Sequence, residues 1–252
     1  MENNSTKKRA KKSNAYRPER VARKKVNLKI DFDKRLLWNS LNAFISGLLG
    51  GIAFAIGAIA FLSVKNKNVG SAIFSLGMIV IFAYGFGFYT SKIGYAIKNT
   101  KEQNIMLFPI WLGNLLGAML VGGVMHLTRA KISALLQSRA NQLCSEKLSD
   151  SVGGILVLSI FCGLLMFIAT DNYKNAKNAA QKYITLILTS MIFLLSGFEH
   201  FASSGCMFAM AGNIDIRVMW YLLIMTLGNT IGALIIPLSH SGVKLVQNLA
   251  KK

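Results

Sequence analysis

Apolar runs of about 20 residues or more recur along the whole chain, and they constrain its fold more than any other feature. Hydrophobic residues make up 53% of the 252 positions and charged residues only 15%, which is too apolar for an ordinary soluble domain. The alternation typical of a transmembrane barrel is not seen, and helices are the other way to satisfy every backbone polar group in lipid. The sequence therefore predicts an all-α membrane protein.

Six transmembrane helices are expected, at about residues 39–64, 69–97, 105–127, 152–170, 182–211 and 217–242. The second and fifth are longer than the roughly 20 residues that a straight span needs. Both carry glycines and polar residues near the middle, at 83–91 and 195–205. Such segments in matching positions of two halves are typical of broken helices at a binding site. A continuous helix that is tilted or kinked is the alternative.

The second half of the chain repeats the first in sequence. The pattern Gly-Asn-x-x-Gly-Ala occurs at 113–118 and again at 228–233, each time one span after a predicted break. Three spans per half is an odd number, so the two halves must be inverted relative to each other. The small residues allow close helix packing, and Asn114 and Asn229 are expected to support the broken helices by bonding their freed backbone groups.

The basic residues predict the orientation in the membrane. If the N-terminus is cytoplasmic, most of the 29 lysines and arginines fall on the cytoplasmic side, led by the first 36 residues. The positive-inside rule then places both termini in the cytoplasm, with the spans in the cell (inner) membrane. The predicted regions are a basic tail at 1–36, a membrane domain at 37–245 and a short tail at 246–252.

The basic N-terminal tail also has the composition of a nucleic-acid-binding arm, since the net charge of the chain is +19. A topogenic tail that touches anionic lipid explains the same charge, and we therefore expect no nucleic-acid partner. The tail lacks the apolar core and cleavage site of a secretory signal, so it is expected to remain on the mature protein.

The segment between the third and fourth spans has the pattern of an amphipathic helix. Its apolar residues recur at helical spacing, at Ile132, Leu135, Leu136, Ala140 and Leu143. A helix that lies in the outer interface explains this pattern, and so does a contact between subunits.

Metal and cofactor chemistry is not indicated. The three cysteines and three histidines are scattered, without CxxC or HExxH spacing, so we expect no metal and no cofactor. A membrane-embedded hydrolase would require Ser203 or Ser204 to pair with His240, and no GxSxG motif surrounds either serine.

Glu199 and His200 are the informative ionisable residues, because they lie inside the fifth apolar segment. A charge there costs about 2.5–3.5 kcal/mol even on the lenient insertion scale, so such residues are functional candidates by default. A neutral imidazole avoids this cost and can still donate a hydrogen bond or exchange a proton. Glu199 is expected to accept from freed backbone N–H groups or from a ring nitrogen. The alternative is a buried pair that only holds a kink together.

Several short motifs resemble those of the formate/nitrite transporter family. They are SGFEH at 196–200, FYTS at 88–91, FSLG at 74–77 and the two Gly-Asn-x-x-Gly-Ala segments. The resemblance covers about residues 38–242. It implies pentamers of aquaporin-like six-helix protomers, each with its own pore for formate, nitrite or hydrosulfide.

The resemblance also implies roles for individual residues. His200 matches the central pore histidine, Thr90 the threonine between the two halves of the second helix, and Lys147 a lysine near the outer vestibule. Glu199, which adjoins His200 in the same segment, is also expected at the pore. The outer apolar constriction matches Phe74 and Phe193, and the cytoplasmic one Met78, Phe88 and Tyr89.

Three positions depart from the family pattern. Gly87 stands where an acidic residue is usual, and Gly163 and Ser204 stand where asparagine is common. These departures leave the pore route intact but affect the expected selectivity.

The function expected from the residues and the resemblance is a selective channel or transporter for small monovalent anions, with hydrogen bonding or proton exchange at His200. The alternative is a membrane-embedded enzyme or a non-conducting sensor on the same scaffold. We expect a channel and not an enzyme, embedded in the lipid bilayer as a homopentamer. The physiological anion, the direction of transport and the choice between channel and proton-coupled transport are left open.

Overall fold

A computed structural model describes residues 18–128 and 131–249, and these ranges contain ten helices and no strand. By its internal contacts the chain divides into residues 1–39 and 40–252. Helix α1 (Pro18–Ser63) runs across this division. The first 17 residues of the predicted N-terminal tail, and the last three of the C-terminal tail, lie outside the described residues.

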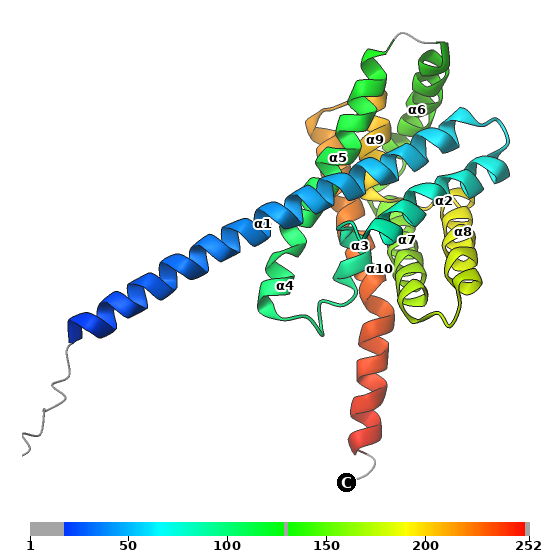
Figure 1. Cartoon of the computed structure of the whole chain (residues 1–252). Helices are drawn as coiled ribbons and strands as arrows, with labels where there is room; N and C mark the ends of the chain where they lie inside the picture. The colour runs from blue at the N-terminus through cyan, green and yellow to red at the C-terminus, as the bar shows by residue number, and fades with distance from the viewer. Residues whose placement is uncertain (1–17, 129–130, 250–252) are drawn as a thin grey trace, which may run out of the picture. The chain divides into compact units, whose positions relative to one another are not determined.

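Five helices in the described part of the chain are long and apolar enough to cross a membrane. The helices that follow α1 are α2 (Lys67–Tyr84), α3 (Tyr89–Ile93), α4 (Lys101–Ile105), α5 (Leu107–Leu127), α6 (Lys131–Ser149), α7 (Val152–Asn175), α8 (Ala179–Leu195), α9 (Phe201–Met210) and α10 (Ile216–Leu249) (Figure 1). Helices α8 and α9 are shorter and together form the predicted fifth span, just as α2 and α3 form the second.

The predicted breaks in the second and fifth spans are confirmed, and they have the same local geometry. Gly85 and Gly197 both have a φ of 69°, the left-handed conformation that glycine adopts without strain and that ends a helix. After each glycine the chain bonds back in the same way, with Phe86 N–H donating to Ile81 O at 2.9 Å and Phe198 N–H to Phe193 O at 3.0 Å. Neither span is therefore a continuous kinked helix.

The packing of residues 40–252 follows the inverted repeat. Helix α7 packs against α10, and the part of α1 from residue 40 packs against α5 in the same way. Gly51 lies directly on the backbone of Asn114, and Gly163 on that of Asn229. The pairs α5–α9 and α10–α3 also correspond, while α2 packs against its own counterpart α8 (Figure 1). Small residues thus allow the close approach that the sequence predicts.

Helix α6 is the predicted amphipathic helix. Its buried stripe is formed by Leu136, Ala140 and Cys144, which recur every four residues, and the helix packs against α9. Leu135, which the sequence placed on the apolar stripe, is 38% exposed. The contact with α9 brings this helix to the second broken span.

Candidate functional site

Asn114 holds the first break in place through its side chain. Its Nδ2 donates to the carbonyls of Gly47 at 2.7 Å and Gly87 at 2.8 Å, and its Oδ1 accepts from the N–H of Tyr89 at 2.8 Å. Both donors and the acceptor of the amide are therefore used. The break frees backbone groups that are buried, and this side chain satisfies them.

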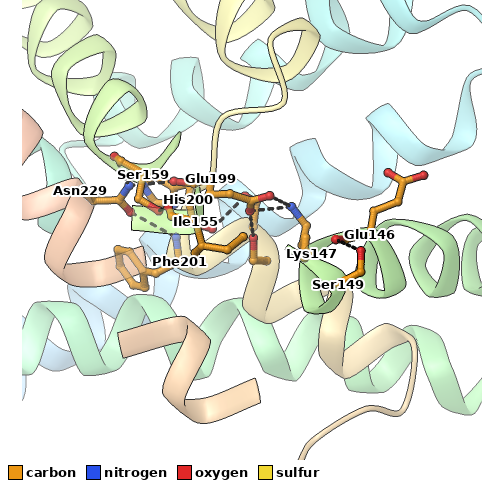
Figure 2. A network of polar contacts seen from close by, with 11 residues as sticks. Glu146, Lys147, Ser149, Ile155, Ser159, Glu199, His200, Phe201 and Asn229 are labelled. Carbon is orange, nitrogen blue, oxygen red and sulfur yellow. Dashed lines mark hydrogen bonds and ion pairs between the residues drawn. The ribbon is translucent and has the colours of Figure 1, made fainter. Parts of the chain in front are cut away.

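Asn229 does the same at the second break. Its Nδ2 donates to the carbonyls of Ser159 at 2.9 Å and Glu199 at 2.8 Å, and its Oδ1 accepts from Phe201 N–H at 3.2 Å (Figure 2). The two asparagines thus bond equivalent atoms in the two halves. An asparagine suits this position because few other side chains offer two donors and an acceptor in one plane.

The repeat places Phe88 and His200 at equivalent positions, each directly before the half-helix α3 or α9. Their rings meet face to face, with an interplanar angle of 3° and centroids 5.3 Å apart. The two broken spans therefore touch at these two residues. At the centre of the repeat, the apolar ring of Phe88 from the first half therefore faces the hydrogen-bonding ring of His200 from the second half.

The imidazole of His200 is fully buried and bonded at both nitrogens. Nδ1 accepts the backbone N–H of Ala202 at 3.2 Å, and Nε2 lies 3.1 Å from the hydroxyl oxygen of Thr90. A nitrogen that accepts from a backbone N–H carries no proton, so the neutral ring has its proton on Nε2. Nε2–H therefore donates to Thr90, and the hydroxyl proton of Thr90 is left to donate elsewhere.

Aromatic rings enclose His200 on several sides. We call Phe54, Phe88, Phe193 and Phe201 the aromatic shell; their ring centroids lie 4.7, 5.3, 6.3 and 4.9 Å from that of His200. Phe54 was missed by the sequence analysis, because it stands in an ordinary apolar run of α1 with no motif around it.

The residues predicted to form constrictions lie around the same centre. Phe74 and Phe193 are brought together, with centroids 5.6 Å apart. Met78 is buried, and Phe88 stacks on His200 itself. The Tyr89 hydroxyl lies 2.9 Å from Thr230 Oγ1, which ties α3 to α10.

Glu199 has a partner that the sequence analysis did not predict. Its two carboxylate oxygens accept from Lys147 Nζ at 2.5 and 2.6 Å (Figure 2). Oε2 also accepts from Ser204 Oγ at 2.9 Å. The expectation of backbone N–H or ring-nitrogen donors for this carboxylate was wrong. Helix α6 packs on α9 and supplies the lysine, and a buried carboxylate is less costly beside an opposite charge.

A cavity of about 560 Å³, which we call the vestibule, opens beside this ion pair. Its lining reaches Phe193, Glu199 and Ser203, the neighbours of His200 on the α8–α9 side. Its charged lining residues are Lys65, Lys67, Arg139 and Lys147 together with Glu146, Asp150 and Glu199. The basic side chains outnumber the acidic ones by one.

The sequence analysis also missed Arg139, which lines the vestibule. Its guanidinium donates to the carbonyl oxygens of Leu62 and Val64 at the end of α1. It thereby joins α6 to the α1–α2 connection and satisfies carbonyls that the end of a helix leaves without partners.

The family model described as formate/nitrite transporter matches residues 20–240. The chain belongs to the formate/nitrite transporter family. The resemblance drawn from its motifs is thereby confirmed, and the chain is a membrane-embedded protein.

Individual family members are distant in sequence. The formate channel FocA of Haemophilus influenzae is 23% identical over 177 residues, which are 63% of this chain and 62% of that protein. The formate channel FocA of Escherichia coli K12 is 25% identical over 195 residues, or 70% and 68% of the two chains. The matched part thus spans slightly less than two thirds of the Haemophilus protein.

A solved structure described as a pentameric formate channel with formate bound superposes with a TM-score of 0.68. The superposition covers 82% of this chain and 98% of the formate channel's chain, and the two sequences are 21% identical. The likeness confirms the predicted six-helix fold of the formate/nitrite transporter family.

The structure shows the surroundings of the three positions that depart from the family pattern. At Gly87 the backbone N–H donates to Ser46 Oγ at 2.7 Å, so a hydroxyl from α1 satisfies a backbone group at the first break. At Gly163 a Cβ would lie only 2.1 Å from Asn229 O, so the close contact of α7 with α10 excludes any larger residue. At the third position, Ser204, the hydroxyl bonds Glu199.

The serines considered for hydrolysis are engaged elsewhere. Ser203 Oγ donates to the carbonyl of His200 at 3.1 Å and Ser204 Oγ donates to Glu199, whereas His240 is exposed on α10. This arrangement gives no support to a serine–histidine dyad.

Proposed function

We propose that the chain is a selective channel or transporter for small monovalent anions, with formate, nitrite and hydrosulfide as the candidate substrates. The observation that carries the proposal is the hydrogen bond between Thr90 and His200 inside the aromatic shell. Two broken helices that meet at a buried polar pair are typical of a substrate site at the membrane midplane. The formate channels among the relatives support the same anion class.

The vestibule is the proposed outer part of the path. Lys65 and Lys67 lie on its wall and attract small anions, while the charge of Lys147 is largely balanced by Glu199. Phe193 is among the residues that line the cavity, and its ring contacts that of Phe74. An anion is thus concentrated at the wall and reaches an apolar constriction.

The aromatic shell then disfavours an anion that has lost its hydration without gaining hydrogen bonds in exchange. Removing an anion from water among aromatic rings is costly unless hydrogen bonds replace its hydration. Thr90 provides such a bond, because Nε2–H of His200 donates to its oxygen and leaves the hydroxyl proton for the substrate. An anion that accepts this bond, or that crosses as its neutral acid, passes the shell at lower cost.

Hydrogen bonding at His200 has more support from the geometry than proton exchange. An imidazolium would carry a proton on Nδ1, and that proton would point at the N–H of Ala202. Two donors facing each other repel, so the neutral ring suits this site. The proposed role of His200 is to orient Thr90 and keep its hydroxyl proton available to the anion.

Transport into proteoliposomes tests the proposal. Purified protein in liposomes is expected to carry formate, nitrite or hydrosulfide well above the rate of empty liposomes. A matched control is protein with Thr90→Val, which keeps the volume of the side chain and loses the hydroxyl. If wild-type and empty liposomes take up all three anions equally, the proposed function is wrong.

We further propose that the protein is a homopentamer in the inner membrane, with both termini in the cytoplasm. The pentameric formate channel of similar fold and the positive-inside distribution support this assembly and orientation. Native mass spectrometry in detergent is expected to give five copies. Protease added to inside-out vesicles is expected to remove the N-terminal tail, and protection in those vesicles would contradict the orientation.

Enzymatic activity is not part of the proposal. The relatives named above are channels, and the serine hydroxyls near His200 have other partners. The membrane-embedded enzyme therefore has no specific observation in its favour.

A further inference from the structure

Ser190 has a buried hydroxyl that the structure leaves without a partner. Among the described residues, the buried side-chain atoms with no hydrogen-bond partner are Asn172 Oδ1 and Ser190 Oγ, and Ser190 is 0% exposed. Other hydroxyls in these helices bond the carbonyl one turn earlier, as Ser159 does to Ile155 at 2.6 Å and Thr170 to Met166 at 2.7 Å. This back-bond is the usual arrangement for a helical serine or threonine. Ser190 lacks it.

The position of Ser190 on α8 indicates which way the hydroxyl faces. Leu186, Ser190 and Phe193 are all buried, and at 3.6 residues per turn they lie on one face of the helix. Phe193 on this face contacts the rings of Phe74 and His200. Ser190 therefore shares the face that α8 turns to the centre of the repeat, one turn nearer to the start of the helix.

The inverted repeat relates Ser190 to a buried residue of the first half. Helices α2 and α8 begin at equivalent asparagine caps, Asn66 and Asn178, and are followed by the equivalent glycines Gly85 and Gly197. Counted from these caps, Ser190 stands at the position of Met78, which is also fully buried. The first half thus has an apolar side chain where the second half has a hydroxyl.

We propose that the Ser190 hydroxyl lines the anion path and donates a hydrogen bond to the passing substrate. It would be a second hydroxyl donor in the path, in addition to that of Thr90. The inference rests on the proposed function and names the class of substrate. A hydroxyl donates more strongly to the oxygens of a small oxyanion such as formate or nitrite than to the sulfur of hydrosulfide. Ser190 therefore favours small oxyanions over hydrosulfide.

Flux measurements with Ser190→Ala test this role. Formate and nitrite flux are expected to fall about fivefold, the factor of one hydrogen bond, while hydrosulfide flux falls less. The matched control is Thr189→Val, because the Thr189 hydroxyl is already bonded to Thr185 O at 2.7 Å. That control is expected to leave the ratio of oxyanion to hydrosulfide flux as in wild type.

Stability separates a transport role from a structural one. Since the Ser190 hydroxyl bonds nothing in the chain, Ser190→Ala is expected to unfold at the same temperature as wild type or higher. An unchanged ratio of oxyanion to hydrosulfide flux in Ser190→Ala would overturn the inference while leaving the proposed function in place. Failure of the wild-type protein to carry any of the anions would remove both.

A second variant tests the exposure of this position to the path. Ser190→Cys is expected to be blocked by a small charged methanethiosulfonate reagent, and formate is expected to slow the block. The native thiols Cys144, Cys162 and Cys206 are buried, so wild type treated with the same reagent is the control. Absence of block in a conducting Ser190→Cys protein would place the side chain away from the path and overturn the inference.

Discussion

His200 Nε2 lies 3.1 Å from the hydroxyl oxygen of Thr90, although the two residues are 110 positions apart and belong to opposite halves of the repeat. This bond joins the two broken spans through side chains. Because Nδ1 of the same ring accepts from Ala202, the direction of the bond follows, with the histidine donating to the threonine.

Thr90→Val is expected to lower anion flux about five- to tenfold, because it removes the hydroxyl and leaves the Nε2–H of His200 without an acceptor. Thr90→Ser keeps the hydroxyl and is expected to retain most of the flux. Stopped-flow uptake into proteoliposomes measures both. Equal flux in wild type and Thr90→Val would exclude a direct role for this hydroxyl.

His200→Asn is expected to assemble normally, because an asparagine can still cap α9 with its side-chain oxygen. Flux is expected to fall by a similar factor at every pH between about 5 and 8, because Nδ1 of His200 accepts from Ala202 N–H and this bond favours the neutral ring. Uptake assays at a series of pH values, beside gel filtration of the assembly, give the comparison. A loss that depends strongly on pH would instead indicate proton exchange at His200.

Lys147→Met or Glu199→Gln alone is expected to destabilise the protein by about 3–5 kcal/mol, because each leaves the other member of a nearly buried pair without its partner. The double variant is expected to recover most of this stability. Thermal unfolding of wild type, the two single variants and the double variant in detergent gives the four stabilities of a double-mutant cycle. Additive losses in the double variant would show that the two charges do not interact.

Gly163→Ala is expected to destabilise the protein by about 1–3 kcal/mol, because the new methyl group would meet the backbone of Asn229. Gly123→Ala is the matched control, since a Cβ there has no atom within 4 Å. That control is expected to be neutral or slightly stabilising. The same stability for both variants would show that α7 and α10 can separate without cost.

Cys144 on α6 is expected to resist alkylation in the folded protein. Burial raises the pKa of the Cys144 thiol to about 12, so the reactive thiolate is scarce until the pH approaches that value. Iodoacetamide labelling between pH 7 and 10, read by mass spectrometry, is expected to be slow when the protein is folded and fast in sodium dodecyl sulfate. Rapid labelling of the folded protein at pH 8 would show that α6 leaves its place on α9.

The broken helices were predictable because their causes are local. Apolar length and the glycines within the two segments are local signals, so the breaks at Gly85 and Gly197 could be read from the chain. Asn114 and Asn229 lie about one span further along, and they could be read because their motif is repeated in both halves. His200 was predictable for a related reason, since an ionisable group inside an apolar segment needs a function or a partner.

The partners of these residues were decided only by the tertiary structure. Lys147 meets Glu199 because α6 packs on α9, and no local pattern encodes that contact. Phe54 reaches His200, and Gly163 lies on Asn229, only after distant helices pack. The sequence by itself determined where helices form and break, because those preferences act over one or two turns. Contacts between segments far apart in the chain depend on the packing of the whole bundle, which decided how the site is surrounded.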